Sequence, residues 1–215
     1  MSVSFINGAG NAFPASNTDL TSIVVGNLLV AWGRFFGVGS APTIVDSSGN
    51  TWTLQVDFAN GSSRCCAWTC VSASATSAHL TFTGSGSFPE VVIGQWNTST
   101  GTWTFGGSPV TSAGAQSASP WTAPAKSGLT VGDLVLGLFE NETGSETYSS
   151  SGGWTVRITE SQNITTLVDK IAAGTTETPQ VAVSAPSATV GAATINFHIS
   201  AAPPPAHRPA VVIMQ

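Results

Sequence analysis

The stretch Thr21-Ser-Ile-Val-Val-Gly-Asn-Leu-Leu-Val-Ala-Trp32 decides the fold, because the chain contains it twice. It returns as Gly128-Leu-Thr-Val-Gly-Asp-Leu-Val-Leu-Gly-Leu138, and the glycines Gly26 and Gly132 lie 106 residues apart. Self-similarity at a fixed spacing is typical of proteins built from repeated structural units. The stretch therefore predicts two units of one design.

Two further matches keep the same order along the chain. The turn sequence Ser47-Ser-Gly-Asn-Thr-Trp-Thr-Leu54 reappears as Ser150-Ser-Gly-Gly-Trp-Thr-Val156. Ala67-Trp-Thr-Cys-Val-Ser-Ala73 then corresponds to Leu167-Val-Asp-Lys-Ile-Ala-Ala173 at an offset of 100 residues. The repeated order indicates an internal duplication.

The pattern of apolar residues predicts strands and no long helix. Val, Ile, Thr and Trp cluster in short segments, and Gly, Asn and Ser bound these segments at turns. We find no long stretch with the 3.6-residue apolar period of a helix. The sequence thus predicts an all-β protein, an antiparallel β-sandwich of two pseudo-repeats. Strands are expected near residues 22–33, 51–58, 63–72, 78–84, 90–97, 129–140, 154–160, 164–172, 179–184 and 192–199.

The repeat also sets the expected domain boundaries. The first unit covers residues 8–96 and the second covers residues 114–199. Residues 97–113 connect them, and their aromatic residues suggest a segment laid across the sandwich. Residues 200–215 form a Pro-rich C-terminal arm, a stiff spacer that carries the strand-forming residues Val211, Val212, Ile213 and Met214. Such a segment is suited to adding a strand to the sheet of a neighbouring subunit.

Composition excludes two classes of partner. The 215 residues carry a formal net charge of -5, which removes the electrostatic attraction that supplies most nucleic-acid affinity. The longest apolar segment is too short to cross a bilayer, and we expect no membrane contact and no signal peptide. Hydrophobic residues make up 41% and charged residues only 8%, which favours a packed β protein with a hydroxyl-covered surface.

The motifs resemble those of a known class of modules. Val-Gly-Asn/Asp-Leu, followed by Asp46-Ser-Ser-Gly-Asn-Thr-Trp-Thr53 and a final apolar strand, is similar to the duplicated, jelly-roll-like β-sandwich modules of bacteriophage structural proteins and some bacterial surface proteins. The resemblance covers most of residues 8–199 and brings no catalytic residues with it. It implies a non-enzymatic part of a virion or of a cell surface.

The expected role is a capsid decoration, cement or tail-associated subunit. Its partners would be other capsid or tail proteins, which it would contact through its termini, in a homo-oligomer or a larger assembly. It would be made in the host cytoplasm and end in the virion. A glycan-binding adhesion module, with a surface glycan as partner, is the alternative, and a hydrolase that uses Glu140, Glu142 or His79 comes third.

Aromatic residues supply the candidate contact sites. Phe35 and Phe36 lie in a predicted loop at the end of a sheet, where they form an exposed apolar contact or are tucked under the loop. Trp103 and Trp121 have no aromatic counterpart in the other unit. They either pack in the core, which we favour, or stack on a sugar.

The acidic residues Glu140, Glu142 and Glu146 form the one acidic cluster and a weak calcium candidate. The segment lacks the Asp-x-Asp-x-Asp-Gly pattern of calcium loops, so a solvated loop is the favoured interpretation. We expect no metal and no cofactor.

Histidine and cysteine complete the candidates. His79 and His198 lie on predicted strands of different units, which a sandwich could bring together. Cys65, Cys66 and Cys70 match none of the usual zinc spacings, and we interpret them as reduced, packed thiols.

Overall fold

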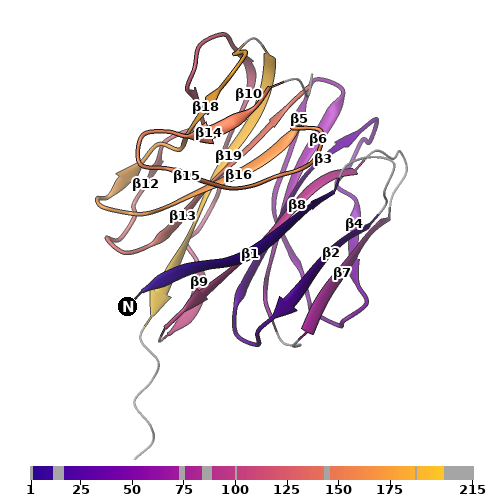
Figure 1. The fold of residues 1–215 in the computed structure, drawn as a ribbon, viewed down its shortest axis with the longest axis vertical. Helices are drawn as coiled ribbons and strands as arrows, with labels where there is room; N and C mark the ends of the chain where they lie inside the picture. The colour runs from indigo at the N-terminus through magenta and orange to yellow at the C-terminus, as the bar shows by residue number, and fades with distance from the viewer. Residues whose placement is uncertain are drawn as a thin grey trace, which may run out of the picture.

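The computed structural model describes residues 2–11, 17–72, 76–83, 89–99, 101–142, 146–186 and 188–200. Every regular element within these ranges is a β-strand, and none is a helix (Figure 1). The all-β prediction is therefore confirmed. The arm residues Val211–Met214 lie outside the described residues.

The first half of the chain forms one large and one small antiparallel sheet. In the order in which they pair, the strands of the large sheet are β1 (Val3–Asn11), β8 (Pro89–Thr98), β3 (Leu28–Phe36), β6 (Ser63–Val71) and β5 (Thr53–Asn60). Those of the small sheet are β2 (Asn17–Ile23), β7 (Thr76–Thr83) and β4 (Thr43–Asp46).

The second half repeats this strand order. The strands of its large sheet are β10 (Val110–Gln116), β19 (Ala188–Ser200), β13 (Leu134–Asn141), β16 (Thr165–Ile171) and β15 (Thr155–Thr159), and β9 (Thr102–Phe105) also pairs with β19. The strands of its three-stranded sheet are β11 (Trp121–Thr122), β18 (Gln180–Val183) and β14 (Tyr148–Ser150), and a separate pair joins β12 (Lys126–Ser127) to β17 (Thr176–Glu177). In both halves a strand from the start of the half pairs with the strand that ends it: β1 with β8, and β10 with β19.

The ladders of the two halves also have equivalent registers. Trp32 on β3 faces Ala67 on β6, and Leu138 on β13 faces Leu167 on β16. These pairs differ by 106 and 100 residues, the same offsets that separate the repeated stretches of sequence. The β5–β6 ladder is interrupted between Leu54 and Val56, and the β15–β16 ladder between Val156 and Ile158, so even the irregularity recurs.

The sheets stack in four layers. The two large sheets pack face to face around a shared core to which both halves contribute side chains. On its far face, each large sheet is covered by the small sheet of its own half. In Figure 1 the indigo-to-magenta half and the orange-to-yellow half accordingly lie side by side. β13 is buried along its whole length and β3 all but its last residue, because each of these strands has a core on both faces.

Four contacts between the halves form two reciprocal pairs. β1 lies against β15, and β10 lies against β5; β8 lies against β15, and β19 lies against β5. Exchanging the two halves maps each of these contacts onto another one. This is the pattern of an isologous dimer interface, here within a single chain.

The structure corrects the predicted strands 22–33 and 129–140 at their starts. β2 ends at Ile23, and a turn precedes β3, because Gly26 has a φ of +88° and its N–H donates to the Ser72 carbonyl at 2.9 Å. Gly132 has a φ of +99° and bonds the Ala172 carbonyl at 3.0 Å in the same way. Left-handed backbone favours glycine, so the motif that the repeats share forms a turn and not a continuous strand.

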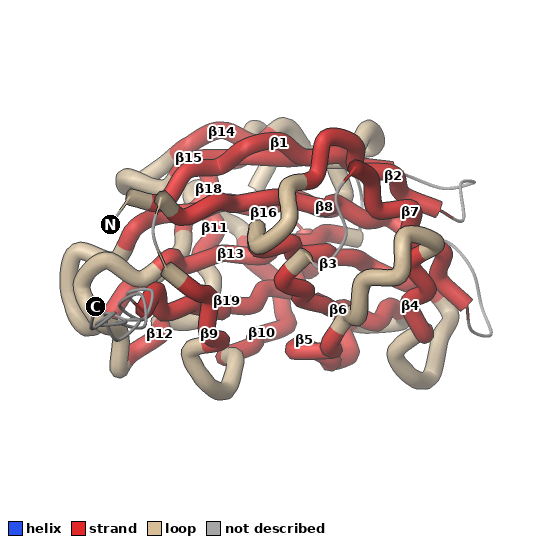
Figure 2. Tube along the Cα trace, turned by 90° about the horizontal axis from the view of Figure 1, so that it is seen from below, coloured by secondary structure: helices blue, strands red, loops and turns tan. Residues whose placement is uncertain are grey.

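These two turns lie at the same end of the molecule. β1 begins and β19 ends there, at the bottom of Figure 1, and Figure 2 looks onto this end. Val3 and Ile171 line one small pocket at this end, while Val71 and Trp103 line another. We call it the apolar end, after its exposed aliphatic residues Val24, Val25, Val71, Val131 and Ile171.

Candidate functional site

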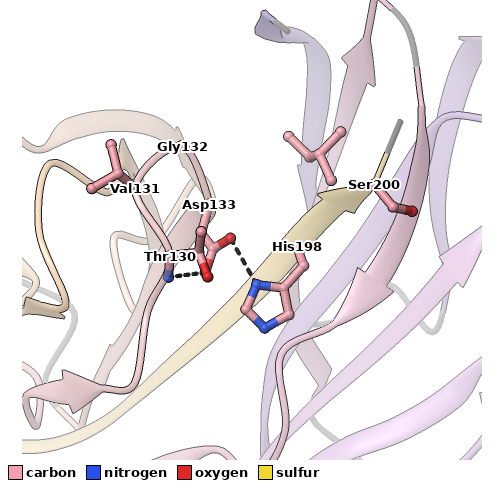
Figure 3. Close-up of a pocket in the computed structure, with 7 residues that line it drawn as sticks. Thr130, Val131, Gly132, Asp133, His198 and Ser200 are labelled. Carbon is pink, nitrogen blue, oxygen red and sulfur yellow. Dashed lines mark hydrogen bonds and ion pairs between the residues drawn. The ribbon is translucent and has the colours of Figure 1, made fainter. Parts of the chain in front are cut away.

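A pocket of about 480 Å³ opens at the apolar end, between the second glycine turn and the last residues of β19 (Figure 3). Apolar and polar groups both face it. Val131 is 68% exposed, the largest exposed fraction among the large hydrophobic residues of the described chain. The residues that line the pocket are Thr130, Val131, Gly132, Asp133, His198, Ile199 and Ser200.

Asp133 organises the polar side of this pocket. Its buried carboxylate accepts a hydrogen bond from the Thr130 N–H at 3.0 Å, which closes the turn, and one from the Asn196 amide at 3.1 Å. His198 Nδ1 lies 2.7 Å from the other carboxylate oxygen. The carboxylate fixes the ring, and Figure 3 shows the second ring nitrogen pointing away from Asp133.

The Ser200 hydroxyl of this pocket does not face the His198 imidazole. Ser200 lies two residues beyond His198 on the same strand, but its hydroxyl is 2.8 Å from the Thr102 hydroxyl. Figure 3 shows the Ser200 side chain turned away from the imidazole. An oriented imidazole is thus present, while this serine is not placed as a nucleophile for it.

The first half has the same turn with different side chains. Asn27 occupies the position of Asp133, and its amide donates to Gln95 at 2.8 Å. The backbone bonds of the two turns correspond one for one. The Asp133–His198 pair is therefore a feature that the second half adds to a shared frame.

The main chain also leaves a strand position open beside the pocket. On one side, β19 pairs with β9 as far as Ser200. On the other side its ladder with β13 stops at Phe197, because β13 begins only at Leu134. Within the described chain, residues 198–200 therefore have no ladder partner on the side that faces the pocket.

A second polar cluster is sealed between the two halves at the opposite end. The Arg34 guanidinium donates to Glu90 at 3.0 Å and lies 3.6 Å from a Glu140 oxygen. The Cys65 thiol donates to Glu140 at 3.2 Å, and the Asn60 amide also donates to it. Burial raises the pKa of Glu140 to about 7, although the hydrogen bonds and Arg34 favour its charged form.

The repeat explains how this cluster is built. Arg34 and Glu140 occupy equivalent positions on β3 and β13, so the interface brings them together. Glu90 pairs with Arg34, whereas the small Gly191 pairs with Glu140. A Cβ at Gly191 would overlap the Glu140 carboxylate and lie 2.8 Å from the Cys65 sulfur. Gly191 thus leaves the room that the buried carboxylate occupies.

The sequence-based prediction of a solvated acidic loop is wrong for two of its three glutamates. Glu140 and Glu146 are both buried, and only Glu142 is partly exposed. Across the described chain, which omits residues 143–145, no group of three or more His, Cys, Asp or Glu residues could hold a metal ion.

The predicted aromatic contacts separate into buried and exposed residues. Phe35 is only 2% exposed and packs edge-on against Trp68, so its predicted role as a partner contact is wrong. Phe36 is 42% exposed, and the Arg34 guanidinium lies 5.8 Å above its ring. Of this pair, Phe36 alone lies at the surface.

Both candidate sugar-stacking tryptophans are buried. Trp121 has no exposed surface, and its indole N–H donates to the Gln116 carbonyl at 3.2 Å. Trp103 packs into the shared core against Phe197. Their burial agrees with the packing interpretation and leaves neither ring face free for a sugar.

Histidines and cysteines serve local contacts. His79 is bonded to Asp19 on the small sheet of the first half, so the structure does not bring it to His198. Cys65, Cys66 and Cys70 are buried free thiols, as predicted, and burial raises the pKa of each of them, that of Cys70 to about 11.

No known protein family, curated protein or solved structure matches this chain. Within the described residues, no helix could serve as a membrane span.

Sequence reasoning missed the pocket at the apolar end. Asp133 and His198 lie 65 residues apart, and no motif links them. The replacement of Asn27 by Asp133 at the equivalent position was the one signal in the sequence. That difference marks where the second half departs from the first.

Proposed function

We propose that this chain is a non-enzymatic structural subunit of a virion, a capsid decoration, cement or tail-associated protein that docks onto its neighbours through the apolar end. The observation that carries the proposal is the distribution of exposed aliphatic residues. Five of the nine large hydrophobic residues that are exposed in the described chain lie at this one end: Val24, Val25, Val71, Val131 and Ile171. Grouped exposed apolar residues mark interaction surfaces.

The remainder of the molecule supports a mechanical role. The central strands β3 and β13 have a core on both faces, so they have no solvent face to adapt to a small ligand. The strand order β1-β8-β3-β6, with β2-β7-β4 behind it, supports the jelly-roll-like resemblance. The Glu140 cluster is buried between the halves, so its charged groups do not form a surface site.

The glycan-binding alternative is less well supported. It depends on exposed aromatic rings, and both of its tryptophan candidates are buried. The exposed Phe36 is a single ring at the opposite end from the pocket. Docking through the apolar end accounts for more of the exposed hydrophobic residues than sugar stacking does.

Co-purification with particles tests the proposed function. Particles from the source are banded on a density gradient, and an antibody against the purified chain is applied by immunogold labelling. We expect the chain to band with the particles and the gold to label their surface. If the chain stays in the soluble fractions while the particles are complete without it, the proposal is wrong.

A further inference from the structure

We propose that the pocket beside His198 accepts the segment Val211–Met214 of a second copy of this chain, as an extra strand added to β19. This inference rests on the proposed function and deepens it, because it names the partner and the residues that join two subunits. Strand addition supplies main-chain hydrogen bonds, and flanking pockets supply side-chain contacts.

The acceptor is an open position in a sheet. Residues 198–200 of β19 pair with β9 on one side only, and the pocket occupies the place on the other side where β13 has not yet begun. Unpaired edges of this kind template pairing with another chain. The opening is three residues long, which suits a segment of about four residues.

The walls of the opening are apolar where an added strand would place side chains. Val131 stands exposed on the turn, and Ile199 lies on β19 itself. The charge of Asp133 is already satisfied by Thr130, Asn196 and His198. An uncharged, β-branched segment therefore fits better than a charged one.

The donor segment has the matching chemistry. Val211-Val-Ile-Met214 contains three β-branched residues and no charge, and such residues are enriched in strands. It is the one apolar run of the chain beyond β19.

Spacer length selects a second copy over the same copy. Ser200 itself lines the pocket, so the chain leaves β19 at the acceptor. Residues 201–210 include Pro203, Pro204, Pro205 and Pro209, and proline-rich sequence extends by about 3.1 Å per residue, roughly 30 Å over this stretch. A proline-rich sequence of that length would carry the apolar segment away from its own pocket and towards that of a neighbour.

Oligomeric state tests the inference with a matched pair of surface variants. Val131→Asp places a charge in the pocket, while Val25→Asp places the same charge at the equivalent position of the first half, which is also exposed. Ile213→Asp alters the donor. The mass of each full chain is measured by light scattering across concentration, and thermal melting checks that each variant is folded.

We expect the wild-type chain and Val25→Asp to associate with rising concentration. Val131→Asp and Ile213→Asp should each weaken association at least about tenfold, the effect of losing about 1.4 kcal/mol of contact. A fluorescent peptide of residues 206–215 should bind the Ile213→Asp chain, and the addition of Val131→Asp should abolish that binding.

Several outcomes would overturn the inference. If Val25→Asp weakens association as much as Val131→Asp does, the apolar end associates nonspecifically. If Val131→Asp associates as strongly as the wild type, the contact lies elsewhere. The wild-type chain could instead be a monomer, with the peptide binding only to the Ile213→Asp variant. That result would show that the pocket holds the C-terminal segment of the same chain. A monomer that binds no peptide, yet bands with particles, would reject this contact and leave the proposed function standing.

Discussion

Burial raises the pKa of the Glu140 carboxyl group from its ordinary value of 4.5 to about 7. The folded state therefore binds this proton more tightly than the unfolded state does. The stability that the proton contributes is fully present below pH 4.5 and is lost as the pH rises through 7. Ionised Glu140 strains the interface between the halves, even though Arg34 lies beside it.

Glu140→Gln should remove this dependence on pH. The amide resembles the protonated acid, so the variant should match the wild type near pH 4.5 and exceed its unfolding free energy by about 1–3 kcal/mol at pH 8. Urea denaturation at the two pH values measures the difference. Glu142→Gln, at the partly exposed neighbour, serves as the control and should follow the wild type. Parallel pH profiles for the wild type and Glu140→Gln would contradict the argument.

Gly191→Ala should destabilise the protein through the same cluster. The added methyl group would meet the Glu140 carboxylate and the Cys65 sulfur, and both of these side chains are fully buried and cannot swing into solvent. We expect a loss of about 1–3 kcal/mol, the usual cost of overpacking a core. Thermal unfolding measures it against Gly39→Ala, where no atom lies within 4 Å of the added group. Equal melting temperatures for the two variants would count against this picture.

At the scale of the strands, the sequence was informative where burial is uniform. β3 and β13 are covered on both faces, so they appear in the sequence as continuous apolar runs. The repeat then located β6, which pairs with β3, and β16, which pairs with β13 in the equivalent register. Periodicity could not separate β3 from the turn before it, because Val24 and Val25 are apolar although they are exposed.

The candidate site was less predictable than the strands, for a physical reason. Asp133 and His198 meet because β13 and β19 are neighbours in the sheet, and a sequence without that pairing shows two unrelated residues. The burial of Glu140 likewise depends on the other half of the chain, whose Arg34 lies beside it and whose Asn60 donates a hydrogen bond to it. Contacts across a tertiary interface leave no local periodicity to detect.

At the scale of the molecule, the two halves behave as partners of an internal dimer. Each large sheet contributes one face to the shared core, which includes Trp32, Trp96 and Leu138 and is closed only when both sheets are present. A half on its own would expose this face to water. The loss of so much apolar burial would leave it without a stable fold in solution.

Dividing the chain between β8 and β9 tests this dependence. Residues 1–100 and 101–215 are produced as separate polypeptides, and a tag on the first is used to recover the second. We expect each polypeptide to aggregate when made alone and the two to form a soluble 1:1 complex when made together, because only then are both faces of each large sheet covered. Trp32→Ala in the first polypeptide should abolish recovery of the second, since it removes a buried ring and its hydrogen bond to the Phe139 carbonyl at 3.0 Å. A first polypeptide that is monomeric and unfolds cooperatively alone would show that its inner face does not need the second half.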